Sequence, residues 1–448
     1  MGEGAADMVK TTRRQMLAAG VSAGALSLLG CNGAAPSAPF FVRREGGRLT
    51  LKDETYRFAG ANLWYGAYLG ADAAYGDRPR LGRELDRLKA LGITNLRIMA
   101  SSEEGPLKAG IKPGFRTKES WNETLFEGLD YCMAEMAKRD MKAVLCLTNF
   151  WEWSGGMMTY LYYTTGRYVD MNDPAHPWPE FPDQNSDFYR SGAAISLYHD
   201  HVRHMVGRTN VVTGQPYRDD VTLMSWQLCN EPRPGVTAAV IDRALPDYYR
   251  WIGATAKLIR SLDGNHLVSL GQEGTTASGG REDVFVEAHK EMDYLTAHIW
   301  PLNWGWVDGK DLAGTWDAGA ARVASYIETH IRLAKEMDKP LVFEEFGFPR
   351  DGELYDPAIP TAFRERFYAM IYKAVEASAA VNGPVVGSNF WAWNGEARSA
   401  HDDHRFHPGD TAYMGDPPHE PQGWYGIFDS DASMQEIIKA HAARVSAG

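Results

Sequence analysis

Short apolar segments alternate with longer amphipathic segments over most of the chain. Each apolar segment is rich in Val, Ile, Leu or aromatic residues and is bounded by Gly, Pro or polar residues, a pattern that predicts a β-strand. The predicted strands are Tyr56–Leu63, Asn95–Met99, Lys142–Thr148, Val221–Leu228, His266–Leu270, Tyr294–Ala297, Leu341–Phe343 and Val386–Phe390.

The amphipathic segments between these strands have helical spacing, and several end in Gly or Lys, as helices do. Strands that alternate with helices predict a parallel sheet, and eight is the number of strands that closes a barrel. An open doubly wound sheet is the alternative, but no GxGxxG motif follows the first strand. We therefore predict an α/β protein with a (β/α)8 TIM barrel as a single catalytic domain over residues 40–448. The predicted helices include residues 81–92, 124–140, 248–264 and 321–339.

Two connections, residues 150–200 and 395–425, are too long for ordinary barrel turns and too aromatic for disordered segments. Loops of this length often carry function. We expect both to form walls around a site at the C-terminal face of the strands, where barrel enzymes hold their reactive groups.

The first residues are typical of an export signal. Arg13 and Arg14 precede an apolar run too short to span a bilayer comfortably, which resembles a twin-arginine signal. Residues 28–31 resemble a bacterial lipobox, in which Cys31 is lipidated; an ordinary cleaved signal with an incidental Cys31 is the alternative. We predict a signal over residues 1–31, a linker over 32–39, and a periplasmic or cell-envelope lipoprotein, or an extracellular protein, whose one membrane contact is the lipid anchor.

The charge and the cysteines exclude some classes of partner and site. A formal net charge of −12 argues against nucleic acid as a partner, because phosphate binding requires clustered Lys and Arg. Beyond Cys31, the chain holds Cys132, Cys146 and Cys229, all inside apolar segments. An odd number of such residues predicts small buried side chains rather than disulfides or a zinc site.

Two carboxylates stand out because each comes at the end of a predicted strand. Glu231 follows the fourth strand in SWQLCNEPRPG, and Glu345 follows the seventh in EEFG. Glu344 precedes Glu345, and since side chains alternate along a strand, we expect only one of the two to face the barrel mouth. A carboxylic acid and a carboxylate on opposite sides of a cleft suit the cleavage of a glycosidic bond.

These motifs resemble glycoside hydrolase family 5 along essentially the whole chain after residue 40. Within that family, LCNEPRPG, NFWEWSGG and EEFG resemble the mannan-degrading branch. The resemblance rests on Arg97 in strand two, Asn230-Glu231-Pro232 after strand four, His298 after strand six, Glu345-Phe346-Gly347 after strand seven and Trp391 after strand eight.

The resemblance implies a role for each of these residues. Glu231 matches the general acid/base and Glu345 the nucleophile of a retaining enzyme that forms a covalent mannosyl-enzyme intermediate. Asn230 matches the residue that binds the sugar 2-hydroxyl, and Arg97 matches the cation beside the nucleophile. Trp391 matches the apolar floor of the subsite for the cleaved sugar. The family chemistry needs no cofactor and no metal.

Further substrate-binding positions are less closely defined. Arg233 matches a position that mannanases use on the leaving-group side. Many family members have His-x-Tyr after strand six, where this chain has His298-Ile299-Trp300; an indole N–H can donate but cannot accept, so Trp300 replaces only part of the role of that Tyr beside the nucleophile. Because they follow strands three and five, we add Asn149, Trp151 and Glu273 as candidates.

Tryptophans gather near the same strand ends. Aromatic faces pack cores and also stack on sugar rings, and their grouping predicts an aromatic-lined cleft. Eight of the 14 Trp lie at or just past the ends of strands one, three, six and eight: Trp64, Trp151, Trp153, Trp300, Trp304, Trp306, Trp391 and Trp393.

The long stretch after the last strand bears on how the substrate is cut. Residues 391–429 resemble an exo-acting β-mannosidase of this branch, whose loop blocks the cleft beyond one sugar. We therefore predict an exo-β-mannosidase acting on mannan or manno-oligosaccharides. An endo-β-1,4-mannanase is the second hypothesis, and a cellulase or β-glucosidase of the same family the third. An inactive glycan-binding surface lipoprotein is the alternative from another class, against which both glutamates argue.

One segment within that stretch has a second interpretation. Residues 401–407, HDDHRFH, have a His spacing that would suit a structural metal. Loops rich in His and Asp are common, however, and this one can equally border the substrate cleft.

Overall fold

The computed structural model describes residues 40–446. The predicted export signal, the lipobox with Cys31 and the linker over 32–39 lie outside the described residues and stay predictions. Among the described helices, none is long and apolar enough to cross a membrane.

Eight parallel strands form the centre of the molecule, and the first of them, β4, pairs with the last, β11. The two remaining edges, β8 and β9, are joined near their ends: Asp293 N donates to Val268 O at 2.9 Å and His298 N donates to Glu273 O at 3.1 Å. The predicted (β/α)8 barrel is confirmed. In spatial order the strands are β8 (Leu267–Ser269), β7 (Leu223–Gln227), β6 (Lys142–Cys146), β5 (Asn95–Met99), β4 (Phe58–Asn62), β11 (Val385–Phe390), β10 (Leu341–Phe346) and β9 (Leu295–Ile299).

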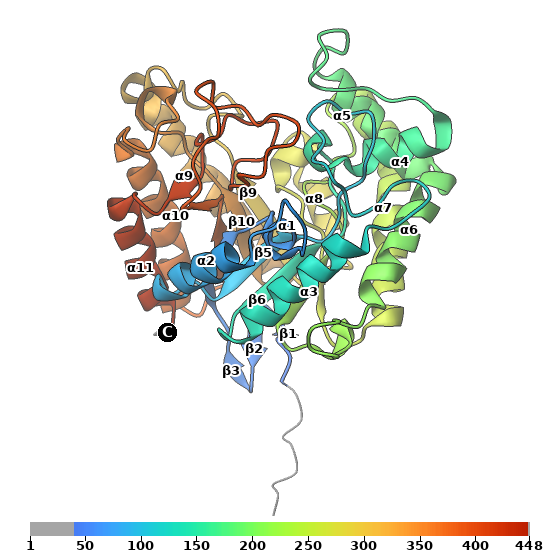
Figure 1. Cartoon of the computed structure of the whole chain (residues 1–448). Coiled ribbons are helices and arrows are strands. Elements are labelled where there is room, and N and C mark those ends of the chain that lie inside the picture. The colour runs from blue at the N-terminus through green and yellow to red at the C-terminus, as the bar shows by residue number, and fades with distance from the viewer. Residues whose placement is uncertain (1–39, 447–448) are drawn as a thin grey trace, which may run out of the picture. The chain divides into compact units, whose positions relative to one another are not determined.

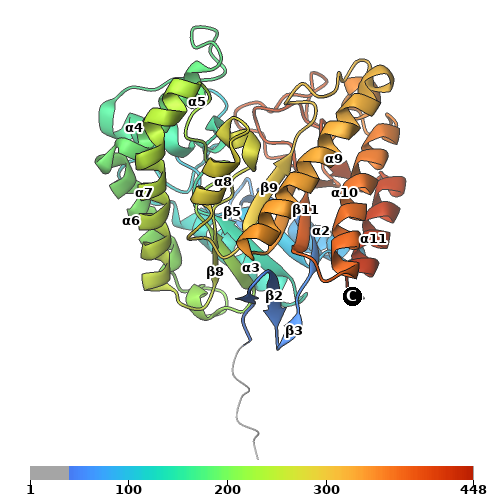
Figure 2. The same ribbon diagram turned by 180° about the vertical axis from the view of Figure 1, so that it is seen from behind.

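Helices surround this sheet, as Figures 1 and 2 show from opposite sides. Each of the four helices given by residue range above is present, and two begin about ten residues earlier than predicted. The α-helices are α1 (Gly66–Gly70), α2 (Arg78–Ala90), α3 (Glu123–Ala137), α4 (Gly156–Thr165), α5 (Glu180–Asn185), α6 (Gly192–Val206), α7 (Ala238–Leu262), α8 (Glu282–Ala288), α9 (Leu312–Met337), α10 (Ala362–Ala380) and α11 (Ala432–Ser446). Single 3-10 turns are η1 (Glu152–Ser154), η2 (Ser186–Arg190), η3 (Tyr217–Asp219), η4 (Thr275–Ser278) and η5 (Asp351–Glu353).

The barrel strands are buried on both faces, which explains why they read as continuous apolar runs rather than as alternating ones. Cys132, Cys146 and Cys229 are buried free thiols, as predicted. At one end of the barrel lie the antiparallel strands β1 (Arg43–Glu45), β2 (Arg48–Leu51) and β3 (Glu54–Thr55). Leu49 in β2 and Val42, the residue before β1, pack against side chains near the start of the barrel strands, such as Phe58 and Val144.

Both long connections lie at the opposite end of the barrel, at the top of Figure 1. Residues 150–200 fold into η1, α4, α5, η2 and the start of α6. Residues 395–425 have almost no regular structure and lead to a short pairing of β12 (Trp393–Gly395) with β13 (Ile427–Phe428). The carboxyl ends of the strands therefore open between two structured walls.

Candidate active site

The backbone turns sharply where β7 ends, and this turn directs Glu231 away from the strand. Glu231 has φ = 51°, a left-handed conformation that is uncommon for a residue with a side chain. Its amide donates to Gly271 O at 2.8 Å, which ties the turn to the neighbouring strand end. Since Pro232 has no amide hydrogen, the chain cannot continue as regular sheet beyond this point.

An irregularity in β10 places two consecutive glutamates on one side. The pairing of β10 with β9 shifts register between Phe343 and Glu345. Glu345 lines the cavity at the strand ends. Glu344 lies in the barrel interior, where it accepts hydrogen bonds from Gln227 at 2.7 Å and Tyr294 at 3.2 Å. Strict alternation would have sent Glu344 outwards, but the shifted register brings both carboxylates inwards; as predicted, only Glu345 faces the mouth.

Glu231 and Glu345 approach each other across the barrel mouth, with His298 between them. His298 Nδ1 lies 2.6 Å from Glu231 Oε1 and 3.2 Å from Glu345 Oε2. An oxygen of each carboxylate and a ring nitrogen of His298 all lie within 4.8 Å of one another. Retaining glycosidases hold their carboxyl groups about 5–5.5 Å apart and inverting ones about 6.5–9.5 Å. The two carboxylates are therefore close enough to act on one glycosidic bond.

Arg97, in β5, organises the floor of the site. Its guanidinium pairs with Glu345 and donates to Asn230 Oδ1 at 2.7 Å, Gln227 Oε1 at 2.8 Å and Asn62 Oδ1 at 3.1 Å. Arg97 thus links the predicted nucleophile to the predicted 2-hydroxyl ligand. Gln227 and Asn62 were missed from the sequence, although a polar residue ending an otherwise apolar strand was a usable signal.

Asn149 lies behind Asn230 rather than in the cavity wall. Asn149 Oδ1 accepts a hydrogen bond from Asn230 Nδ2 at 3.0 Å, and its own amide nitrogen donates to Ser154 Oγ at 3.0 Å. Its side chain is fully buried. Asn149 therefore holds the orientation of the Asn230 amide, whose oxygen faces Arg97.

Two indoles donate to Glu231. Trp151 Nε1 donates to Glu231 Oε2 at 2.5 Å and Trp300 Nε1 donates to Glu231 Oε1 at 3.3 Å. We expected Trp300 beside Glu345, but its indole N–H contacts the other carboxylate. Trp300 packs against Gly347, where an added Cβ would lie 2.5 Å from the indole ring. The glycine of the EFG motif is therefore required by this close packing.

The charges of the site are interdependent. Burial raises the pKa of the Glu231 carboxyl, but the hydrogen bond and charge of His298, followed by Arg233, lower it more, so the pKa lies below the usual range. Burial lowers the pKa of His298, but the charge of Glu345 and the hydrogen bond to Glu231 raise it well above its ordinary value. The directions of these shifts favour His298 as the holder of the proton between the two carboxylates.

Arg233 and Glu273 form a buried ion pair on the other side of Glu231. Arg233 Nη2 lies 2.5 Å from Glu273 Oε1, and the guanidinium lies 5.0 Å from the centre of the Trp151 ring. Burial raises the pKa of Glu273 above its usual range; Arg233 opposes this effect and the charge of Glu231 adds to it. The pair presents a polar edge next to an aromatic face.

These groups open into a cavity of about 410 Å³ at the strand ends. Five of the eight Trp singled out in the sequence line it, whereas Trp64, Trp306 and Trp393 do not. Met171, Trp178, Asn303, His419 and Glu420 also line it and were not predicted individually, because they belong to loops without strand or helix periodicity. The lining residues are Trp151, Trp153, Met171, Trp178, Asn230, Glu231, Arg233, Glu273, Trp300, Asn303, Trp304, Glu345, Trp391, His419 and Glu420.

The connection after β11 supplies one wall of this cavity through His419 and Glu420. Burial, followed by the charges of Asp416 and Glu345, raises the pKa of Glu420 well above its usual range. Glu420 Oε2 and the indole nitrogen of Trp391 are buried without a hydrogen-bond partner among the described residues. The Trp391 indole nevertheless lies near enough to the Glu420 carboxyl to lower its pKa, and both side chains line the cavity, where a bound sugar can reach them.

The His side chains at the two ends of segment 401–407 each pair with an Asp. His401 Nε2 lies 3.0 Å from Asp410 Oδ1, and His407 Nε2 lies 3.1 Å from Asp403 Oδ2. Within residues 40–446, the one group of His, Cys, Asp and Glu side chains close enough to share an ion is Glu231, His298 and Glu345. In this group, Glu345 receives a hydrogen bond from Arg97, and Glu231 receives hydrogen bonds from two indoles.

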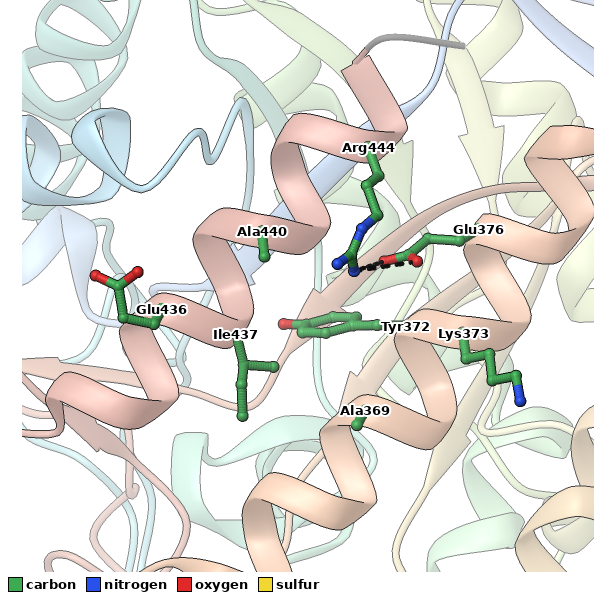
Figure 3. Close-up of a pocket in the computed structure, with 8 residues that line it drawn as sticks. All are labelled: Ala369, Tyr372, Lys373, Glu376, Glu436, Ile437, Ala440 and Arg444. Atoms are coloured by element: carbon green, nitrogen blue, oxygen red, sulfur yellow. Dashed lines mark hydrogen bonds and ion pairs between the residues drawn. The ribbon is translucent and has the colours of Figure 1, made fainter.

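A second hollow lies between α10 and α11 (Figure 3). Two of its four charged residues pair with each other: Arg444 Nη1 lies 3.3 Å from both oxygens of Glu376. Tyr372 stacks on His441 with ring centres 3.8 Å apart. The hollow is built from two outer helices, whereas both predicted catalytic carboxylates lie in the strand-end cavity. That cavity is the candidate active site.

Several known proteins resemble this chain in sequence and in fold. A family model described as "GH family 5 beta-mannosidase-like" matches residues 39–447. Mannan endo-1,4-beta-mannosidase 1 of Arabidopsis thaliana is 28% identical over 367 residues, which cover 78% of this chain and 81% of that protein. The solved glycoside hydrolase family 5 mannosidase of Rhizomucor miehei is 34% identical, with a TM-score of 0.82, over 91% of this chain and 98% of that one. The endo-1,4-beta-mannanase of the same organism has a TM-score of 0.64 at 22% identity, over 91% of this chain and 100% of that one.

Proposed function

This chain belongs to glycoside hydrolase family 5, among its mannosidases and mannanases, and we propose that it is a retaining exo-β-mannosidase that releases mannose from manno-oligosaccharides. One observation carries the proposal. The loop after β11 places His419 and Glu420 in the same cavity as Glu231 and Glu345. A mannan chain that continued past the subsite of the cleaved sugar would meet this wall.

The wall also carries groups that can bind the terminal mannose of a chain. A terminal mannose has one hydroxyl more than an internal unit, at the position where the chain would continue. The buried carboxyl of Glu420 and the indole N–H of Trp391 are hydrogen-bonding groups at that wall. A site built to hydrogen-bond a hydroxyl rejects substrates that leave its buried polar groups unpaired. The likeness to the Rhizomucor miehei mannosidase supports the same assignment.

Hydrolysis then proceeds by two displacements at the anomeric carbon. Glu345, which is paired with Arg97, attacks this carbon; the bond to the leaving oxygen breaks while a bond to the carboxylate oxygen forms, and Glu231 protonates the leaving oxygen. In the second step Glu231 takes a proton from water, the water oxygen bonds to the anomeric carbon, and Glu345 is released as a carboxylate. Asn230, beside Arg97, holds the sugar 2-hydroxyl.

Before substrate binds, His298 holds the proton for the first step. Its Nδ1 lies 2.6 Å from Glu231 Oε1, so the proton has only a short distance to move when it protonates Glu231 in the presence of a bound sugar. Esterification of Glu345 removes the negative charge that raises the pKa of His298. The proton affinity of the His298–Glu231 pair then falls, which suits the second step, where Glu231 acts as a base.

The test is the first product from mannohexaose labelled at its reducing end. We expect labelled pentaose and free mannose before any shorter labelled fragment. Labelled fragments shortened by two or more units in the first turnovers would establish the endo-mannanase, which the Arabidopsis thaliana relative supports as the second candidate. The Glu231→Gln variant serves as control: general acid catalysis contributes about 10²–10⁴-fold, and hydrolysis at the wild-type rate would remove Glu231 from its role.

Export and anchoring form a separate proposal, which rests on the sequence before residue 40. Arg13, Arg14 and Cys31 are arranged as in an exported lipoprotein. We expect the protein to fractionate with membranes in a bacterial host that has the lipoprotein pathway, and the Cys31→Ser variant to be released in soluble form. Equal fractionation of the two proteins would refute the anchor.

A further inference from the structure

One fully buried carboxylate lies at the base of the cavity wall without entering the cavity. Asp416 is 1% exposed, and its two oxygens accept four hydrogen bonds. Oδ1 accepts from the amides of Tyr425 at 2.7 Å and Gly426 at 3.0 Å. Oδ2 accepts from the amide of Gly423 at 2.9 Å and from Asn394 Nδ2 at 3.0 Å. An ionised carboxylate is an acceptor only, so every partner has to be a donor.

This side chain closes a loop. The chain leaves the carboxylate at Asp416 and returns to it at Gly423, so both ends of the intervening segment, residues 417–422, are held at one point. The segment carries His419 and Glu420 into the cavity. Gln422 completes the loop from within, since its Nε2 donates to the carbonyl oxygens of Asp416 at 2.9 Å, Pro417 at 3.2 Å and Glu420 at 3.2 Å.

A buried cation holds the same backbone from its other side. Arg364, in α10, donates to Trp424 O at 2.7 Å and to Gly426 O at 3.1 Å. Residues 423–426 thus have amides bonded to a carboxylate and carbonyls bonded to a guanidinium. This arrangement fixes Tyr425, whose hydroxyl donates to Asn303 Oδ1 at 2.5 Å. Asn303 lines the cavity from the loop after β9, so the wall is joined to the opposite loop.

We propose that Asp416 is the positioning residue that fixes the wall of the cavity and thereby confines cleavage to a terminal mannose. Asp416 acts through Glu420 and Tyr425 and touches no substrate. Charge-assisted bonds from four donors make it more effective than a neutral acceptor. The inference rests on the proposed exo action and names the side chain that produces it.

The test replaces Asp416 with an isosteric amide. In Asp416→Asn, one of the two acceptor oxygens becomes an NH₂ group, so in either orientation two N–H donors face another donor. We expect the loop base to open. With end-labelled mannohexaose, fragments shortened by two or more units should then appear in the first turnovers. The kcat/KM for mannose release should fall about tenfold, mainly through a higher KM, because bonds to a charged acceptor are lost.

The matched control is Asp410→Asn in the same connection. Asp410 pairs with His401 on the exposed part of the loop, and this variant should keep the wild-type products and KM. If folded Asp416→Asn releases only mannose with wild-type efficiency, the inference is wrong. If circular dichroism shows that it does not fold, Gln422→Ala decides: it removes three bonds inside the loop, leaves the buried charge in place, and must shift products in the same direction.

The proposed function and this inference fail differently. A wild-type enzyme that already cuts mannohexaose internally overturns the exo proposal before any variant is measured. A wild-type enzyme that releases only mannose, with unchanged products in both Asp416→Asn and Gln422→Ala, upholds the exo proposal and removes Asp416 from its role.

Discussion

Glu231 and Glu345 belong to one cavity but have different electrical surroundings. Both contact His298, a titratable cation, but only Glu345 is also paired with Arg97, a permanent one. A nucleophile needs a charge that does not vary with pH, and an acid/base needs a neighbour with which it can exchange a proton. The geometry thus supports the assignment of Glu345 as nucleophile and Glu231 as acid/base.

The pH profile tests the role of His298. If the active form carries its proton on the His298–Glu231 pair, activity is lost as pH rises through the pKa of that pair. This pKa is raised above the ordinary His value of about 6.5, so the basic limb of kcat/KM lies above it. His298→Gln keeps a hydrogen-bond donor but no exchangeable charge. We expect the basic limb to move down by about one pH unit or more.

The control for this shift is His407→Gln, which alters an exposed His that contacts Asp403 and the ring of His401 and does not line the cavity. Its profile should match the wild type. A basic limb that stays in place in His298→Gln would mean that Glu231 receives its proton from another group.

At the scale of elements, the connection between α4 and α5 extends the aromatic side of the cavity. Trp178 lies in this connection, is 57% exposed and lines the cavity. Its ring lies 6.5 Å from that of Trp151 at an angle of 21°, so two near-parallel aromatic faces follow one another outward from Glu231. Such faces suit a leaving group longer than one sugar.

We expect Trp178→Ala to lower kcat/KM for mannotriose about three- to tenfold, since an aromatic contact contributes roughly 0.5–1.5 kcal/mol. An aryl mannoside, whose leaving group ends nearer Glu231, should be hydrolysed as before. Trp121→Ala is the matched control, because Trp121 is also exposed, at 38%, but stacks on His204 away from the cavity. Equal losses on both substrates would show that Trp178 stabilises the loop rather than binding sugar.

The barrel strands could be predicted from the sequence, whereas the path of the cavity wall could not. The barrel strands were predictable because burial on both faces forces continuous apolar runs. β10 is longer than predicted, as Glu344 and Glu345 are polar residues inside a strand, held by partners from β5 and β7. The wall was recognisable as long and aromatic, but its path depends on bonds from Asp416 to amides seven to ten residues further along and on Arg364, which lies in α10. Local patterns carry no signal for such bonds.

At the scale of the whole molecule, barrel closure depends on one seam. β8 and β9 are joined by a few bonds rather than by a continuous ladder among the described residues. One of these uses a side chain: Asp293 Oδ2 accepts from the buried amide of Val268 at 2.7 Å, and the same carboxylate pairs with Arg260 at 3.3 Å. The seam also includes the bond from His298 N to Glu273 O, so its hydrogen bonds help to position two residues of the active site.

Asp293→Ala should therefore loosen the barrel at this seam first. A buried amide left without its acceptor costs about 1–3 kcal/mol, which corresponds to a fall in Tm of a few degrees for a chain of this size. Hydrogen exchange should show the Val268 amide losing protection before the amides of β5 and β6, which pair along their whole length. Asp293→Asn retains an acceptor oxygen and should keep most of this protection. If both variants exchange like the wild type, the backbone bonds and the bond from Thr296 Oγ1 to Gln272 O close the seam without Asp293.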